Sequence, residues 1–392
     1  MEATDRPEER FRNTLQTLVS EAHTPQADLE SLLGSKQCVG ELTAGTRLPT
    51  LHEATLLGAY FAVSPALLMQ VEEPSLGVSL RLGSVDGIND VTDSVKHATR
   101  LLSVDRLTRD WGFQEHVRAV STFAPSKVWH QAKAGEKTAA RLRAYLGIED
   151  LEAIEDLTGL VESLGYPVEY RKLPANVHGI SIPEQWESST AWVILVNSED
   201  VWSRQRFTLS HELCHVLQKD IGHVIVDRVT TPDVGPERVA NNFARHFLLP
   251  EEALLQKISG CGAIDSETAA AKLFADVMLT YGVSRDSLLI SLREAGLNIT
   301  EDPHLSYCKN APVHEIMRVS GNSDLWNELN EARGVTIPSE RLTRQVLDAY
   351  GSGLVSLQSV ADVISDGHQG AARRALIEAG WSVPEPAGAR TF

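Results

Sequence analysis

The chain has 392 residues, of which 42% are hydrophobic and 23% charged, and its formal net charge at pH 7 is −17. This length and composition predict a globular protein of two or three domains. The acidic balance argues against broad, sequence-independent nucleic-acid binding, because such binding needs a basic surface that displaces counterions. It is compatible with a small basic patch on an acidic body and with a protein partner.

No apolar run approaches the ~20 residues of a transmembrane helix, and the first residues do not resemble a signal peptide. We therefore expect a cytoplasmic protein with no membrane partner. The four cysteines lie far apart and form no Cys-x-x-Cys pair, so the sequence predicts neither a disulfide framework nor a thiolate zinc site. They are Cys38, Cys214, Cys261 and Cys308.

Short helical patterns fill the beginning of the chain, and we assign them to one five-helix domain over 1–73. After a first apolar face that begins at Phe11, further helices are expected at 25–33, 36–44, 51–61 and 65–69. Gly34 and Ser35 turn the chain between the second and third helices. Two helices joined by a tight glycine turn suggest a helix-turn-helix, whose second helix would enter the major groove of DNA.

This domain resembles Xre/Cro-type domains, especially those of HigA-type antitoxins, through Gln26-Ala27-Asp28-Leu29, Leu33-Gly34-Ser35 and Tyr60-Phe61-Ala62-Val63-Ser64-Pro65. The resemblance implies that operator DNA is a partner. The residues that it places on DNA are Ser35, Lys36, Gln37 and Arg47, the last of them on phosphate. A homodimer is a further expectation, because such proteins read paired half-sites.

Charge favours a second interpretation of the same domain. Residues 1–75 contain five Lys or Arg against eleven Asp or Glu, which leaves little charge for phosphate contacts. The alternative is a dimerisation or partner-docking module, as in an antitoxin-like role. A helical linker region over 74–133 follows, where an apolar stripe that starts at Val91 predicts a long amphipathic helix. Its stripe indicates core packing or a dimer contact.

The centre of the chain carries His-Glu-x-x-His at 211–215. On a helix this spacing places two imidazoles on one face, where both nitrogens can reach one tetrahedral zinc ion. Glu212 follows the first histidine and can take a proton from the metal-bound water. A β-branched run at 191–196 predicts a strand just before this helix. A helix that contains these residues by chance is the alternative.

A third ligand is expected from a second helix that starts after Pro236. Catalytic zinc sites usually take three protein ligands, and Glu237 would complete a His-His-Glu set. The alternative role for Glu237 is that of a helix-start glutamate favoured by the helix dipole.

The central motifs resemble those of the ImmA/IrrE metallopeptidases over roughly 134–256. The residues that carry the resemblance are Arg206-Phe207-Thr208-Leu209-Ser210-His211-Glu212-Leu213-Cys214-His215, the Glu-x-x-Ala-Asn-x-Phe-Ala run at 237–244 and Leu248-Leu249-Pro250. It implies one Zn²⁺ per chain on His211, His215 and Glu237, with Glu212 as the base and Asn241 as a supporting residue. It also implies a protein substrate that is itself a helix-turn-helix repressor.

The chain departs from this family at Cys214, where glycine is usual, and at Arg245 and His246, where small residues are frequent. Those differences put peptidase turnover in question more than metal binding. The edge strand expected to pair with extended substrate is formed by His178, Gly179, Ile180 and Ser181. We regard His178, His223 and His246 as surface or structural histidines.

We expect an α+β, mostly helical fold. Its parts are the five-helix domain, a zincin-like metallopeptidase domain over 134–298 with a small sheet, and a helical C-terminal region over 299–392. Within the last, 300–312 is expected to be irregular, with helices at 338–350, 356–365 and 369–379. The function hypothesis is a regulator fused to a zinc endopeptidase. The alternative is a DNA-binding regulator whose metallopeptidase-like domain is a catalytically silent sensor.

Overall fold

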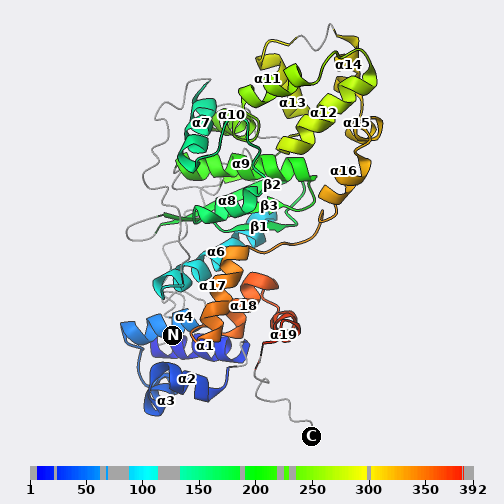
Figure 1. Ribbon diagram of the computed structural model, residues 1–392. Helices are drawn as coiled ribbons and strands as arrows, with labels where there is room; N and C mark the ends of the chain where they lie inside the picture. Colours follow the sequence, from blue (N-terminus) through cyan, green and yellow to red (C-terminus); the bar gives the residue numbers. More distant parts are fainter. Residues whose placement is uncertain are drawn as a thin grey trace.

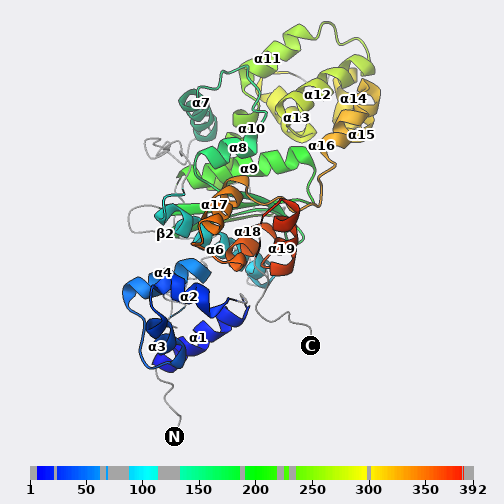
Figure 2. The same cartoon turned by 60° about the horizontal axis from the view of Figure 1, so that its bottom comes forward.

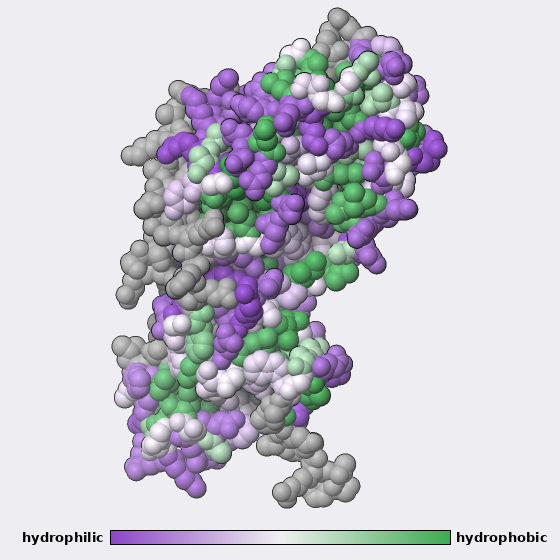
Figure 3. All heavy atoms as spheres, in the orientation of Figure 1, coloured by the Kyte–Doolittle hydropathy of each residue, from purple (hydrophilic) through white to green (hydrophobic). Residues whose placement is uncertain are grey.

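The computed structural model describes residues 7–21, 24–61, 68, 88–113, 133–185, 190–218, 225–228, 235–297, 302–381 and 383. These residues are mostly helical and contain one four-stranded sheet (Figure 1), which confirms the predicted α+β class, and together they form an elongated body (Figure 3). Within this part of the chain, no helix is long and apolar enough to cross a membrane.

The sheet has the strand order β1-β3-β2-β4. β3 pairs in parallel with β1 and antiparallel with β2, which in turn pairs antiparallel with β4. The prediction that 178–182 forms an edge strand is therefore wrong, since Gly179 has neighbours on both sides, Val196 and Asp227. The strands are β1 Val168–Arg171, β2 Val177–Gln185, β3 Thr190–Asn197 and β4 Ile225–Arg228.

Both faces of the sheet are covered by hydrophobic cores, which explains why the sequence of β3 is almost wholly apolar. Trp192 and Ile194 point into one hydrophobic core, and the alternate residues Val193 and Leu195 point into the other. This alternation is the two-residue period of a strand, applied here to two apolar surroundings.

The first face is covered by a layer that begins with α7 to α10, and the helices that follow extend it away from the sheet (Figure 1). Residues 300–312, predicted to be irregular, contain a helix, because Pro303 suits a first turn and Asp302 accepts hydrogen bonds from the backbone N–H groups of His304 and Leu305. The helices are α7 Ala134–Leu146, α8 Leu157–Ser163, α9 Trp202–Gln218, α10 Pro236–Leu248, α11 Glu251–Gly260, α12 Glu267–Tyr281, α13 Arg285–Glu294, α14 Pro303–Asn310, α15 Val313–Ser320 and α16 Ser323–Leu329.

The second face is covered by helices from two distant parts of the sequence. Arg341 of α17 and Asp105 of α6 form a buried ion pair with an Nη2–Oδ1 distance of 2.9 Å. Glu162 of α8 accepts hydrogen bonds from Ser339 Oγ and the Arg341 backbone N–H, and so fixes the start of α17. The helices are α6 Ile88–Asp110, α17 Glu340–Gly351, α18 Leu357–Ile364 and α19 Gln369–Glu378.

The N-terminal helices form a third core beyond α18, and Figure 1 places α17 and α18 between them and the sheet. The Tyr60 carbonyl at the end of α4 accepts a hydrogen bond from the Ser356 N–H at the start of α18. The fifth predicted helix falls mostly on residues outside the described part, as do 74–87, 114–132, His223 and the tail after Pro384. The helices are α1 Pro7–Glu21, α2 Gln26–Leu33, α3 Lys36–Ala44 and α4 Leu51–Phe61.

The closest helix crossing in the first layer joins α7 to α10. A Cβ atom on Gly135 would lie 2.3 Å from the Val239 carbonyl oxygen and 2.6 Å from the Phe243 nitrogen, so only glycine fits there. Nearby, the buried guanidinium of Arg143 donates a hydrogen bond to the Phe247 carbonyl near the end of α10. The two contacts hold α7 against α10 near both ends of α7.

We predict that Gly135→Ala destabilises the protein. The added methyl group meets backbone atoms that cannot move aside alone, and such overpacking costs about 1–3 kcal/mol. The measurement is the midpoint of urea unfolding. Gly260→Ala is the matched control, because a Cβ at Gly260 has no atom within 4 Å. Equal midpoints for the two variants would contradict the packing described for Gly135.

Candidate metal centre

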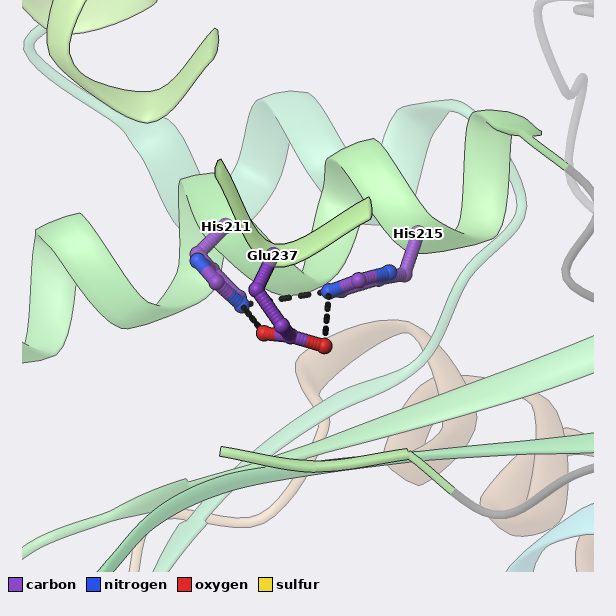
Figure 4. A group of neighbouring side chains, drawn as sticks. All are labelled: His211, His215 and Glu237. Carbon is purple, nitrogen blue, oxygen red and sulfur yellow. Dashed lines mark hydrogen bonds and ion pairs between the residues drawn. The ribbon is translucent and has the colours of Figure 1, made fainter. Parts of the chain in front are cut away.

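Two histidines of α9 converge one helical turn apart. The His211 and His215 Nε2 atoms are 3.1 Å from each other, and both side chains are almost fully buried (Figure 4). Leu209 and Leu213 of the same helix pack into the first core, as their apolar spacing predicts. The helix is therefore held by its apolar side, while the two imidazoles meet at one point.

Glu237 reaches the same point from the first turn of α10. Its Oε2 atom is 3.2 Å from His211 Nε2, and its Oε1 atom is 3.6 Å from His215 Nε2. Burial opposes ionisation of the Glu237 carboxyl, but the two imidazoles outweigh it and hold its pKa well below the usual range. Pro236 occupies the first turn of α10 and Gly235, with φ +57°, turns the chain into the helix. The carboxylate thus reaches the imidazoles in its charged form.

Asn241 lies one turn further along α10 and holds the His211 ring. Its Oδ1 atom is 2.9 Å from His211 Nδ1. An amide oxygen only accepts hydrogen bonds, so in this contact Nδ1 carries a proton and Nε2 is the ring nitrogen that faces Glu237 and His215. This outer contact gives the ring the tautomer that a metal ligand needs.

Glu212 is fully buried beside these histidines. It lies against Gly179 of β2, and Thr208 lies against the same glycine one turn earlier on α9. Thr208 was not among the predicted site residues. Its position four residues before Glu212 puts it on the same helix face, which is the signal that could have identified it.

The donor set fits a metal ion. Ligand atoms of His211, His215 and Glu237 all lie within 4.8 Å of one another, and two imidazole nitrogens with one carboxylate are suitable ligands for a tetrahedral transition-metal site. Cys214 is not part of this group within the described residues, because its side chain is buried in the first core. The thiol that replaces the usual family glycine therefore serves packing.

A second group, His97, Glu169 and Asp366, also has its ligand atoms within 4.8 Å of one another. Here Arg171 Nη1 lies 3.0 Å from Glu169 Oε1 and 3.0 Å from Asp366 Oδ1. The guanidinium thus already balances both carboxylates. We interpret this group as an ionic link that joins α6, β1 and the turn before α19.

Other residues predicted near the site have structural partners. His178 Nδ1 is 2.7 Å from Asp200 Oδ2, and Ile180 points into the second core, away from α9. On α10, Arg245 Nη2 is 3.0 Å from Glu294 Oε1, and His246 Nε2 is 3.7 Å from the other oxygen of that carboxylate. Both departures from the usual family pattern therefore connect α10 to α13.

The residues predicted to bind DNA lie at the start of α3 and beyond its end. Gly34 adopts a left-handed conformation with φ +68° and the Ser35 Oγ caps α3 by accepting from the Cys38 N–H, which gives a tight turn between α2 and α3. Lys36 and Gln37 are exposed. Gln37 Nε2 donates a hydrogen bond to Glu41 Oε1.

Arg47 has carboxylate partners within the domain. Its Nε atom is 2.8 Å from Glu41 Oε2, and its Nη1 atom is 2.7 Å from Glu53 Oε2. Hydrogen bonds from Arg47 hold the pKa of Glu53 well below its ordinary value. A phosphate contact would require this guanidinium to leave both carboxylates.

A cleft separates α2 and α4 from the C-terminal helices. Its lining includes Tyr60, Trp111, Tyr350, Arg374 and Trp381. None of the residues of the candidate metal centre lines it.

Residues 162–292 match the family model Peptidase_M78, described as the IrrE N-terminal-like domain. The matched segment contains α9 and α10, and with them His211, Glu212, His215 and Glu237. It does not extend to the N-terminal helices. No curated protein matches the chain. For this segment the match confirms the resemblance to the ImmA/IrrE peptidases, and the centre of the chain is a metallopeptidase-like domain.

Proposed function

We propose that the chain is a zinc-dependent endopeptidase fused to an N-terminal regulatory domain. The observation that carries this proposal is the convergence of His211, His215 and Glu237 from two helices, with the buried carboxylate of Glu212 between the two histidines in sequence. The match of 162–292 to a peptidase family supports it.

Each residue has a distinct task in the proposed reaction. His211, His215 and Glu237 would hold Zn²⁺, and Asn241 keeps the His211 ring in the required tautomer. A zinc ion bound there supplies a Lewis acid that polarises a peptide carbonyl and lowers the pKa of a water molecule. Glu212 accepts the proton of that water and passes it to the leaving amine, as a general base and then a general acid.

The proposed substrate is a protein, and by the family resemblance a helix-turn-helix repressor. An extended substrate segment needs an unpaired strand edge. Because β2 lies inside the sheet, we assign this role to β4, which pairs with β2 alone within the described residues and adjoins α9. The other outer strand, β1, already has a bridge from Tyr170 to Ile337.

The next prediction concerns zinc binding. Purified protein reconstituted with zinc should hold one ion per chain, and His211→Ala and Glu237→Ala should each lose it, as measured by elemental analysis after dialysis. His246→Ala is the matched control, since this histidine of α10 lies outside the ligand group. Zinc retained by both ligand variants would refute the assigned donor set.

Zinc binding should also depend on pH. The imidazoles must be neutral to bind, so metal content and the stability that the metal confers are full above the ordinary histidine pKa of about 6.5 and fall as the pH drops below it. The measurement is the melting temperature with and without zinc between pH 5 and pH 8. A zinc-induced increase that is the same at both ends would exclude histidine ligands.

A further prediction separates catalysis from metal binding. Glu212→Gln removes the proton acceptor but keeps the side-chain shape, so cleavage should fall at least about 10²-fold while zinc stays bound. The substrate probe is a peptide library made from a bacterial proteome, with cleavage products identified by mass spectrometry. Cleavage by the wild type that persists in Glu212→Gln would show a different base or a contaminating protease.

The alternative function is a DNA-binding regulator with a silent metallopeptidase-like domain, and the tight turn from α2 into α3 favours a DNA-binding role for the N-terminal helices. We expect full-length protein to select sequences from a pool of random duplex DNA. The double variant Lys36→Ala with Gln37→Ala should lose that selection without a change in melting temperature. Arg47→Ala should instead lower the stability of the N-terminal helices by about 1 kcal/mol, because it breaks the ion pairs to Glu41 and Glu53.

No selection by the wild type would favour the partner-docking interpretation of this domain. Loss of DNA selection in Arg47→Ala at unchanged stability would show instead that its guanidinium contacts phosphate.

A further inference from the structure

Gly179 of β2 lies directly against α9. A Cβ atom on Gly179 would lie 2.5 Å from Thr208 Cγ2, 2.9 Å from Glu212 Oε1 and 3.1 Å from Glu212 Cγ. Gly179 does not adopt the positive φ that favours glycine. The requirement for glycine at this position is therefore one of space, and the space is occupied by the side chains of Thr208 and Glu212.

The strand cannot move away to make room. Gly179 pairs with Val196 of β3 on one side and Asp227 of β4 on the other. The next residue, Ile180, is fully buried in the second core, on the opposite face of the sheet. The strand is thus held along its edges and from behind, and α9 is held by its own apolar residues.

We propose that Gly179 is a positioning residue for Glu212. Its backbone, which carries no side chain, fixes the position of the Glu212 carboxylate relative to the metal ligands. This inference rests on the proposed function and deepens it. A side chain at 179 meets both Thr208 Cγ2 and the Glu212 side chain. Of the two, the glutamate is the longer and more flexible, so its carboxylate is displaced. The fold then survives while the base is misplaced.

The effect expected from such a displacement is large for catalysis and small for binding. A shift of about 1 Å in a reacting group can lower the rate about 10²-fold. Gly179→Ala should therefore lower kcat about 10²-fold with little change in KM, at unchanged zinc content. The control Gly260→Ala, where the added methyl group has no neighbour within 4 Å, should leave kcat unchanged.

Thr208 requires a separate control, because the new methyl group also meets its Cγ2 atom. Thr208→Ser removes that atom. In the double variant Gly179→Ala with Thr208→Ser only the contact with Glu212 remains, so lost activity persists if Glu212 is the affected group. Full recovery of kcat in this double variant would assign the effect to Thr208 packing and overturn the proposal. The same double variant supplies a folded protein if Gly179→Ala alone proves unstable.

A double-mutant cycle with Glu212→Asp tests the contact directly. The shorter side chain withdraws its carboxylate from the position of the added methyl group. The combined loss should therefore be smaller than the product of the two single losses. Strictly multiplicative losses, or Gly179→Ala activity equal to wild type, would overturn the proposal.

Cobalt substitution gives a readout that does not depend on turnover. The visible absorption of Co²⁺-loaded protein at fixed pH reports the surroundings of the metal. It should change in Glu212→Gln and in Gly179→Ala, and stay the same in Gly260→Ala. If the wild type binds cobalt but cleaves no peptide, the peptidase proposal fails while these spectra still decide the role of Gly179. The proposal for Gly179 would be overturned by an unchanged Gly179→Ala spectrum or by a wild type that takes up no metal.

Discussion

The packing of four ionisable side chains between α9, α10 and β2, of which three are buried and Glu237 is half-buried, is the constraint that the rest of the structure serves. His211, Glu212, His215 and Glu237 would each be costly to bury without a partner. The two helices offset that cost by bringing the imidazoles and the Glu237 carboxylate within contact of one another. That arrangement requires a fixed position of α10 relative to α9. Gly135, which has no side chain, lets α7 pack closely enough on α10 to hold α10 in that position.

The sheet transmits a second constraint from the far end of the sequence. β2 meets the candidate base on one face and packs Ile180 against the second core on the other. That core is built by α6 and by α17 and α18, and the buried Arg341–Asp105 ion pair joins the two groups of helices. Residues more than a hundred positions after the His-Glu-x-x-His motif therefore help to fix the strand that limits its glutamate.

Local sequence patterns predicted the features that depend on residues close together in the sequence. The helix predicted at 36–44 is α3, with Ser35 and Gly45 at its ends, and the i, i+4 spacing of the two histidines indicated their common face. Strand order depends on pairings between distant segments. The four residues of β4 give no signal of their own, so β2 was wrongly placed at the edge. No pattern in the sequence could show that Gly179 faces Glu212 rather than a substrate, because that contact joins two elements through the fold.

The position of the N-terminal helices limits how they can act on the metal centre. Figures 1 and 2 place α3 at the end of the molecule remote from α9. The described contact with the remainder runs through α4 and α18, at the Tyr60–Ser356 hydrogen bond. A partner bound to α3 would act on the metallopeptidase-like domain only if its affinity differed between two arrangements of that contact. α18 packs on α6 behind the sheet. Such a partner would therefore act on the helices that support β2, and through β2 on the Gly179 backbone that contacts Glu212.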